Sequence, residues 1–162
     1  MRVLKIVEGT SVDGPGLRTS IYLAGCRHAC KGCHNPESWS PRGGREISID
    51  DLVAVIGTND APLTLSGGDP LLQAADMEAL TERVRHSFGF NIWCYTGYRW
   101  EEIVDDPALL SAVRHLDVLV DGPFVLEERD TSLLFRGSRN QRLIDVQRSL
   151  ADPHAPPVLL NL

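Results

Sequence analysis

The sequence predicts an α/β protein with mostly parallel strands, arranged as a partial and open (β/α) barrel. Short apolar runs that are typical of strands alternate along the chain with segments of helical periodicity, and this order favours parallel strands joined by right-handed crossovers. The chain has 162 residues, whereas a closed eightfold barrel takes about 250, so a barrel here must be incomplete. Because no repeat or linker divides the sequence, we expect one domain over residues 1–162.

The individual elements follow from local patterns. Segments rich in β-branched and aromatic residues predict six strands, at residues 2–9, 17–25, 62–68, 90–97, 117–124 and 142–146. Helices are predicted between them, at residues 48–57, in a segment that ends near 88, at 99–104 and at 107–116. Ser48 suits the N-cap of the first helix and Gly57 its end. Residues 25–45, which are rich in glycine and proline, are expected to form a loop, and residues 150–162 a weakly ordered tail.

Composition and charge argue against some classes of binding partner. Hydrophobic residues make up 43% and charged residues 23% of the chain, as in ordinary globular domains. The formal net charge is −6 and the chain has no lysine- or arginine-rich block, which argues against binding nucleic acid through a basic face. The first residues do not resemble a secretory signal, and no stretch approaches the roughly 20 apolar residues that span a bilayer. We therefore expect a cytoplasmic protein that has no membrane segment.

Three of the four cysteines lie in one stretch, "GCRHACKGCHNPESW" (25–39), with the spacing C-x3-C-x2-C. Cys26, Cys30 and Cys33 are followed directly by His34, so part of the stretch also matches the C-x-x-C-H that attaches c-type haem. Haem attachment normally takes place outside the cytoplasm, where we do not expect this chain. A structural disulfide is disfavoured in a reducing compartment. Metal binding or redox chemistry therefore remains for these thiols.

Zinc and an iron–sulfur cluster place different demands on such a set of cysteines. Structural zinc takes four ligands, so His28 or His34 would have to complete the site, and a second C-x-x-C pair is missing. The fourth cysteine, Cys94, lies in a predicted strand, where we interpret it as a small buried hydrophobic residue. Three thiolates on one loop instead match a four-iron cluster with one iron left free of protein ligands. A small molecule could chelate that iron.

A second stretch, "LTLSGGDPLL", carries a glycine pair and a carboxylate at the end of a predicted strand. In α/β sheets, ligands bind at the carboxyl ends of the parallel strands. Gly67 and Gly68 would permit close backbone approach, and the carboxylate of Asp69 would suit the ammonium group of a ligand. Taken alone, the same stretch is also compatible with an ordinary strand-to-helix turn.

With these residues the sequence resembles the radical S-adenosylmethionine (SAM) enzymes, whose signature is C-x3-C-x2-C. More narrowly, "SVDGPGLRTSIYLAGC" ahead of the cysteines is similar to the glycyl-radical-enzyme activating proteins. The closest similarity is to the branch that acts on anaerobic ribonucleoside-triphosphate reductase, and it rests on "VDGPG", "LSGGDPLL", "YTGY", "LVDGPF" and "LLFRGSRNQRLIDV". The resemblance covers nearly the whole chain and implies a single radical SAM domain.

The resemblance implies roles for particular residues. Cys26, Cys30 and Cys33 would ligate a [4Fe-4S] cluster, and the amino and carboxylate groups of SAM would chelate its fourth iron. The implied SAM contacts are Gly32, Cys33 and His34 on the adenine side, Ser66, Gly67, Gly68 and Asp69 around the methionine ammonium, and Tyr95 and Thr96 near the ribose. No side chain is expected to act as a general acid or base, because the cofactor carries out the reaction.

The resemblance also implies a reaction and its partners. Reductive cleavage of SAM would give a 5′-deoxyadenosyl radical, which would generate a glycyl radical on the class III reductase. Flavodoxin or ferredoxin would donate the electron. Docking surfaces are expected at residues 13–16, 121–124 and 136–142. The alternatives are a radical SAM enzyme for another glycyl-radical enzyme or for a small molecule and, from a different class, a non-catalytic module that binds zinc or a cluster.

Overall fold

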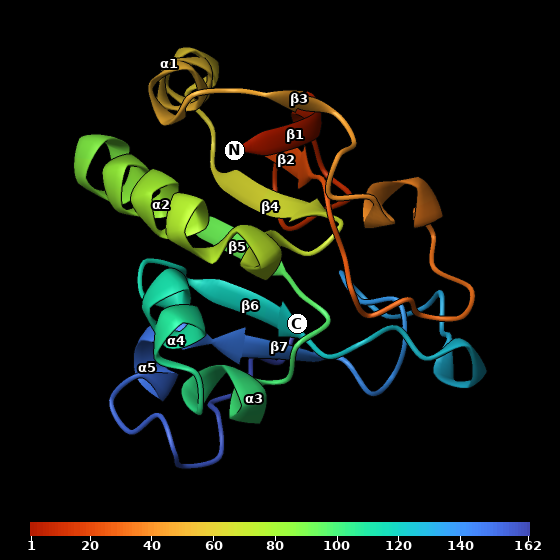
Figure 1. Cartoon of the computed structure of the whole chain (residues 1–162). Coiled ribbons are helices and arrows are strands. Elements are labelled where there is room, and N and C mark those ends of the chain that lie inside the picture. The colour runs from red at the N-terminus through yellow and green to blue at the C-terminus, as the bar shows by residue number, and fades with distance from the viewer.

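The computed structural model describes residues 1–162 and contains one mixed sheet of seven strands in the order β3-β1-β2-β4-β5-β6-β7 (Figure 1). The strands are β1 (Arg2–Thr10), β2 (Arg18–Leu23), β3 (Arg45–Glu46), β4 (Leu63–Gly67), β5 (Ile92–Tyr95), β6 (Val118–Asp121) and β7 (Arg142–Asp145). Neighbours from β2 through β6 are parallel. The pairs β1–β2, β1–β3 and β6–β7 are antiparallel.

The predicted partial, open barrel of mostly parallel strands is therefore wrong. Half of the strand pairings are antiparallel, and the sheet ends at β3 on one side and β7 on the other. The connections explain the difference, because a parallel pair needs a crossover of a dozen or more residues. Residues 11–17 are too few for a crossover and instead join β1 and β2 as a hairpin. The segment from β6 to β7 is longer, but it contains only a 3-10 turn and returns antiparallel.

The helices are α1 (Ile49–Asn59), α2 (Ala74–Phe88), α3 (Trp100–Val104), α4 (Pro107–Val113) and α5 (Val146–Ser149), with 3-10 turns η1 (Pro36–Trp39), η2 (Pro70–Gln73) and η3 (Leu126–Glu128). The predicted N-cap is confirmed, because the hydroxyl of Ser48 accepts a hydrogen bond from the Asp51 N–H at 3.1 Å. The predicted end near residue 88 is also confirmed, since α2 ends at Phe88 before left-handed Gly89. The helix α1 runs two residues past Gly57.

The sheet has two faces of different character. One face carries the main core, in which Leu65 and Cys94 of the central strands pack against residues of α2 such as Met77 and Leu80. Helices α1, α2 and α4 cover this face (Figure 1). Cys94 is fully buried in this core, as the sequence predicts. Because side chains alternate along a strand, the neighbouring residues face the other way. That second face carries a smaller apolar cluster on β5, β6 and β7, which contains Trp93 and Val120, and buried polar residues such as Thr64 on β4.

The C-terminal residues run along the outer edge of β7. The N–H of Asp145 donates to the carbonyl of Val158 at 2.9 Å, and the N–H of Leu160 donates to Leu143 at 2.8 Å. These bonds cover strand-edge groups that would otherwise be unpaired. None of the helices combines the length and the apolar character that crossing a membrane requires.

Candidate functional site

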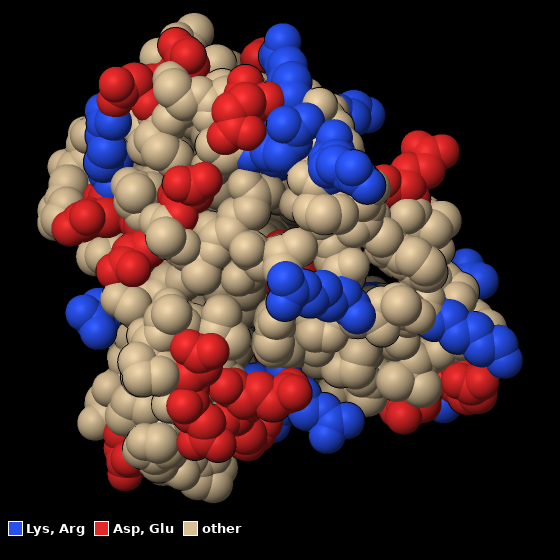
Figure 2. Space-filling view, in the orientation of Figure 1, with Lys and Arg blue, Asp and Glu red and all other residues tan.

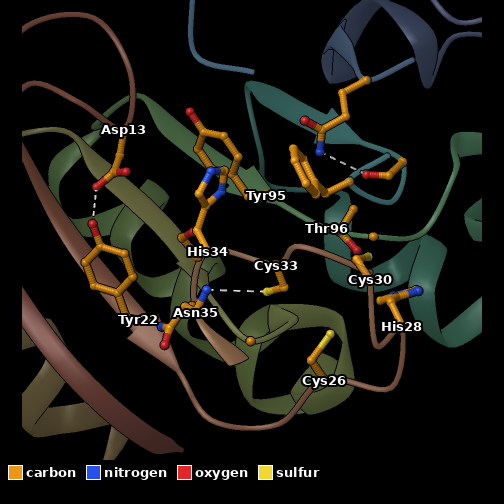
Figure 3. A pocket seen from close by; sticks show the side chains of 17 residues that line it. Asp13, Tyr22, Cys26, His28, Cys30, Cys33, His34, Asn35, Tyr95 and Thr96 are labelled. Carbon is orange, nitrogen blue, oxygen red and sulfur yellow. Dashed lines mark hydrogen bonds between the residues drawn. The ribbon is translucent and has the colours of Figure 1, made fainter. Parts of the chain in front are cut away.

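A cavity of about 320 Å³ lies at the carboxyl ends of the parallel strands (Figure 3). Its wall is built by the second face of the sheet, by the loop of residues 25–45 and by residues that follow β5 and β6. Nine predicted site residues line it: Cys26, Cys30, Cys33, His34, Ser66, Gly67, Gly68, Tyr95 and Thr96. Two others do not line it: Asp69 is buried behind the lining, and Gly32 lies in an exposed part of the cysteine loop.

The three cysteines of the loop approach the cavity from one side (Figure 3). All three are half-buried, and none forms a disulfide. The loop turns sharply between them, because Ala29 and Gly32 adopt left-handed φ angles of 48° and 77°. Its start is fixed by a hydrogen bond of 3.1 Å from the Cys26 N–H to the carbonyl of Trp39. The fold therefore directs three free thiols into one space.

This arrangement fits a cluster better than a single metal ion. No group of three or more histidine, cysteine, aspartate or glutamate side chains is placed to hold one ion. In a four-iron cluster each thiolate binds a different iron, so the ligands surround the site rather than meet at a point. Soft thiolate ligands suit iron–sulfur clusters. The fourth cysteine, Cys94, lies in the core on the opposite face of the sheet. Only three cysteines therefore face the cavity.

The glycine pair at the end of β4 makes close backbone packing possible. A Cβ atom on Gly68 would lie 2.2 Å from the carbonyl oxygen of Gly25, and one on Gly67 would lie 2.3 Å from the backbone nitrogen of Leu23. Two hydrogen bonds join the same segments, from Gly68 N–H to Leu23 and from Asp69 N–H to Gly25, at 2.8 and 2.7 Å. The pair thus presses the strand end against the start of the cysteine loop and also lines the cavity.

The carboxylate of Asp69 is buried, with 1% of the residue exposed, and its hydrogen-bonding capacity is used within the chain. It accepts from the Leu71 N–H at 3.0 Å, from the Thr96 hydroxyl at 2.9 Å and from the Gly97 N–H at 2.9 Å. The imidazole Nε2 of His28 lies 2.7 Å away, and this contact raises the pKa of His28. Asp69 therefore connects the cysteine loop to the ends of two strands.

The long segment between β6 and β7 closes the cavity from the other side. The rings of His34 and Phe124 lie 5.2 Å apart, and both residues line the cavity together with Gln141. A Cβ on Gly32 would lie 2.9 Å from the side chain of Leu126, so Gly32 permits this segment to pack on the cysteine loop. All three predicted docking segments, 13–16, 121–124 and 136–142, thus contribute residues to the cavity wall.

Sequence reasoning missed Tyr22 and placed Asp13 only in a docking segment. Both residues line the cavity, and the Tyr22 hydroxyl donates to Asp13 Oδ2 at 2.5 Å. Burial, followed by this hydrogen bond, raises the pKa of Tyr22. The signal for Tyr22 was available, because it alternates with Ile21 and Leu23, which belong to the core on the opposite face. His28 was considered only as a zinc ligand, and its contact with Asp69 could not be seen from spacing.

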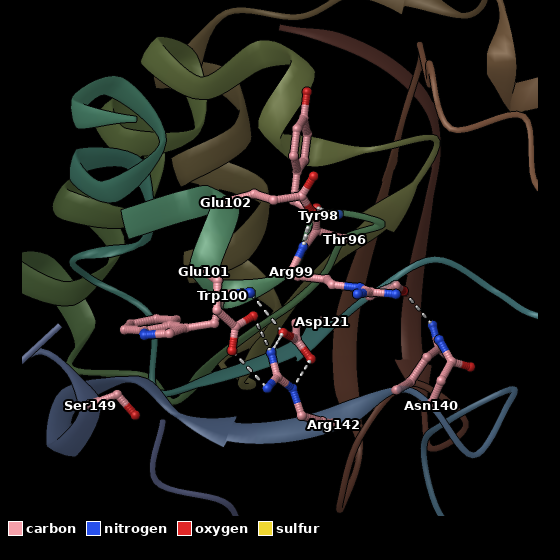
Figure 4. Close-up of polar contacts among 12 residues, drawn as sticks. Thr96, Tyr98, Arg99, Trp100, Glu101, Glu102, Asp121, Asn140, Arg142 and Ser149 are labelled. Atoms are coloured by element: carbon pink, nitrogen blue, oxygen red, sulfur yellow. Dashed lines mark hydrogen bonds and ion pairs between the residues drawn. The ribbon is translucent and has the colours of Figure 1, made fainter. Parts of the chain in front are cut away.

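A separate polar network lies beside the cavity (Figure 4). The guanidinium of Arg142 donates to both oxygen atoms of Asp121, at 3.0 and 2.5 Å, and to both oxygen atoms of Glu101, at 3.0 and 2.9 Å. Asp121 is buried and also accepts from the Trp100 N–H at 2.8 Å. The hydrogen bonds from Arg142 lower the pKa of Glu101. This network holds β6, β7 and α3 together.

Three free thiols around one cavity are compatible with a single iron–sulfur cluster, and comparison with known families places the chain in this class. The family model described as "4Fe-4S single cluster domain" matches residues 12–144. The resemblance to a particular branch is also confirmed. The chain belongs to the family of anaerobic ribonucleoside-triphosphate reductase-activating proteins.

Three relatives with that name illustrate the similarity. The protein of Haemophilus influenzae is 37% identical over 152 residues, which cover 87% of this chain and 96% of the relative. The protein of Escherichia coli (strain K12) is 37% identical over 140 residues, with 80% and 89% covered. The protein of Enterobacteria phage T4 is 34% identical over 139 residues, with 82% and 86% covered. The similarity therefore extends over most of each chain.

Proposed function

We propose that this chain is a radical SAM enzyme that activates an anaerobic ribonucleoside-triphosphate reductase by generating a glycyl radical on it. The observation that carries the proposal is the set of three thiols, Cys26, Cys30 and Cys33, around one cavity at the carboxyl ends of the strands. These thiols bind a [4Fe-4S] cluster. A reduced cluster held there would supply one electron to SAM, and cleavage of the S–C5′ bond would give methionine and a 5′-deoxyadenosyl radical. This radical would take a hydrogen atom from a glycine of the reductase and leave as 5′-deoxyadenosine.

The methionine part of SAM lies against the end of β4. Ser66, Gly67 and Gly68 line the cavity there, and backbone carbonyl oxygens suit an ammonium group. Asp69 contributes indirectly, because its carboxylate is already engaged by the hydroxyl of Thr96 and the ring of His28. Its role in this proposal is to hold the wall of the SAM site rather than to touch the ligand.

The nucleoside part of SAM lies toward the segment between β6 and β7. His34 and Phe124 offer two aromatic rings at this side of the cavity, and Gly32 and Cys33 supply the backbone next to them. Tyr95 faces the same space (Figure 3), close to the proposed ribose position. Stacking and backbone contacts of this kind fix a ligand while they exclude water from it.

The reductase reaches SAM through an adjoining cavity of about 360 Å³. Five residues line both cavities, so the two are continuous: Asp13, His34, Tyr95, Phe124 and Gln141. The adjoining cavity is bordered by Val12, which is 72% exposed, and by Phe135 and Arg136. An extended segment of the partner would fit along it. The electron donor in this proposal is flavodoxin or ferredoxin, and the reducing cytoplasm keeps the thiols free for iron.

Reconstitution tests this proposal. The full chain would be loaded with iron and sulfide without oxygen, reduced, and mixed with SAM, and the formation of 5′-deoxyadenosine and methionine would be followed. We expect both products in equal amounts and an absorbance band from the cluster. A chain that carries four irons and four sulfides but cleaves no SAM, with or without the reductase, would contradict the proposal.

A further inference from the structure

Arg18, at the start of β2, is buried in an unusual way. Only 1% of the residue is exposed, and its hydrogen-bond acceptors are neutral. It donates to the hydroxyl of Thr64 at 2.8 Å, to the carbonyl of Leu63 at 2.8 Å and to the carbonyl and side-chain oxygen of Asn91 at 3.1 Å. The guanidinium thus reaches beneath β4 to the segment before β5. Burial lowers the pKa of Arg18 to about 10, as expected for a charge held away from water.

The loop that contains Asp13 rests directly on this arginine. A Cβ on Gly14 would lie 2.9 Å from Arg18 Cδ and 3.4 Å from the ring of Trp93, so a side chain has no room there. Gly14 and Gly16 have φ angles of 140° and 75°, which other residues rarely adopt. The guanidinium also lies 5.5 Å from the centre of the Trp93 ring. The glycines of the loop therefore follow the shape of the Arg18 side chain.

Thr64 joins the arginine to the loop. Its hydroxyl accepts from Arg18 Nε at 2.8 Å and donates to the backbone carbonyl of Asp13 at 3.0 Å. Thr64 is fully buried and does not line either cavity. On its other side, Asp13 accepts from the Tyr22 hydroxyl at 2.5 Å. Thr64 therefore holds the backbone of Asp13, and Tyr22 holds its carboxylate.

We infer that Arg18 and Thr64 are positioning residues, which set Asp13 at the junction of the two cavities for binding of the reductase. This inference rests on the proposed function. Asp13 lines both cavities. Tyr22 holds its carboxylate and Arg18 donates to the carbonyl of Pro15 at 3.4 Å, but only Thr64 holds the backbone carbonyl of Asp13 itself. The planar guanidinium presents five donors in a fixed fork, and this geometry explains why an arginine occupies position 18. A lysine ammonium could not reach Thr64, Leu63 and Asn91 together.

The test uses a matched pair of substitutions at Thr64, because a substitution of Arg18 would also remove its buried bonds to Leu63 and Asn91. Thr64→Val keeps the shape and removes the hydroxyl, whereas Thr64→Ser keeps the hydroxyl and removes a methyl group. For Thr64→Val we expect the KM for the reductase to rise about tenfold, in line with the loss of a buried hydrogen bond. The rate of SAM cleavage without the reductase should not change. Thr64→Ser should have a KM within about twofold of the wild-type value, because it keeps both hydrogen bonds.

Hydrogen–deuterium exchange of the full chain gives a readout that does not depend on activity. Thr64→Val should speed exchange in residues 11–17 and leave α2 unchanged, and Thr64→Ser should resemble the wild type. Equal KM values for the two variants, or equally fast exchange throughout the chain, would overturn the inference. If the wild-type chain fails to activate the reductase, the proposed function fails instead. In that case unchanged exchange in residues 11–17 of Thr64→Val would still overturn the positioning role.

Discussion

The imidazole of His28 and the carboxylate of Asp69 lie 2.7 Å apart and join the cysteine loop to the end of β4. His28 stands between Cys26 and Cys30 in the sequence. Its ring also packs on the backbone of Gly97, where a Cβ would lie 2.4 Å from the ring. The loop that presents the thiols is therefore held by the same carboxylate that caps η2.

We expect Asp69→Asn to weaken both the fold and the retention of iron. An amide would place an N–H₂ group among donors and leave at least one of them unpaired, at a cost of about 1–3 kcal/mol. Urea denaturation of the iron-free chain and the rate of iron loss to a chelator measure the two effects. Asp152→Asn, at an exposed position, is the matched control. An Asp69→Asn chain that unfolds and loses iron like this control would show that the contact has no such role.

Substitutions of the four cysteines should distinguish those that ligate the cluster from the one that packs in the core. Cys26→Ala, Cys30→Ala and Cys33→Ala should each lose the cluster absorbance and SAM cleavage, because each removes one thiolate. Cys94→Ala should keep both, although its fully buried position means a loss of about 1 kcal/mol or more in stability. Iron content and the yield of 5′-deoxyadenosine after reconstitution measure the outcome. Normal cleavage in any of the first three variants would contradict the ligand assignment.

Gly68→Ala should impair SAM binding through a clash. The new Cβ would lie 2.2 Å from the carbonyl oxygen of Gly25, so the strand end and the cysteine loop would have to move apart. Gly9→Ala is a useful control, because its φ of 67° is unfavourable for alanine but no atom lies within 4 Å of the new Cβ. Titration of the reconstituted chain with SAM gives the affinity. Equal affinity in the two variants would mean that the packing at Gly68 does not shape the site.

Arg142→Met should destabilise the chain strongly. The substitution leaves the buried carboxylate of Asp121 without its charged partner, and removing one partner of a buried pair costs about 3–5 kcal/mol. Glu101→Gln should cost less than about 1 kcal/mol, because the Glu101 side chain is 60% exposed. Urea denaturation at neutral pH distinguishes them. A Glu101→Gln chain that loses more stability than Arg142→Met would reverse this assignment.

The ion pair of Arg142 and Glu101 predicts that the stability of the chain depends on pH. Arg142 lowers the pKa of Glu101 from its usual 4.5, so the folded state favours the ionised carboxylate more than the unfolded state does. The stability that Glu101 contributes is therefore present above pH 4.5 and is lost as the pH falls through the lowered value. In Glu101→Gln, unfolding free energies measured between pH 6 and pH 3 should fall less steeply than in the wild type. An identical slope in the two chains would contradict the prediction.

Local patterns predicted six of the seven strands and missed only the two-residue strand β3. The cysteine spacing and the glycine pair identified Cys26, Cys30, Cys33, Gly67 and Gly68, and the family resemblance added the other predicted residues that line the cavity. The direction of strand pairing could not be predicted, because the antiparallel pairs at the edges depend on the path of two connections rather than on strand composition.

The hydrogen-bond partners of Asp69 could not be predicted from the sequence either. His28 and Thr96 lie 41 and 27 residues away in sequence, and only the folded sheet brings them together.

The most direct measurement is electron paramagnetic resonance of the reductase after anaerobic incubation with the reduced, reconstituted chain and SAM. A stable organic radical should form on the reductase, and its hyperfine splitting should collapse when the glycines of the reductase are deuterated at Cα. Cys30→Ala should give no signal under the same conditions. A reductase that remains free of radical while SAM is cleaved would contradict the central claim and direct the search to another target.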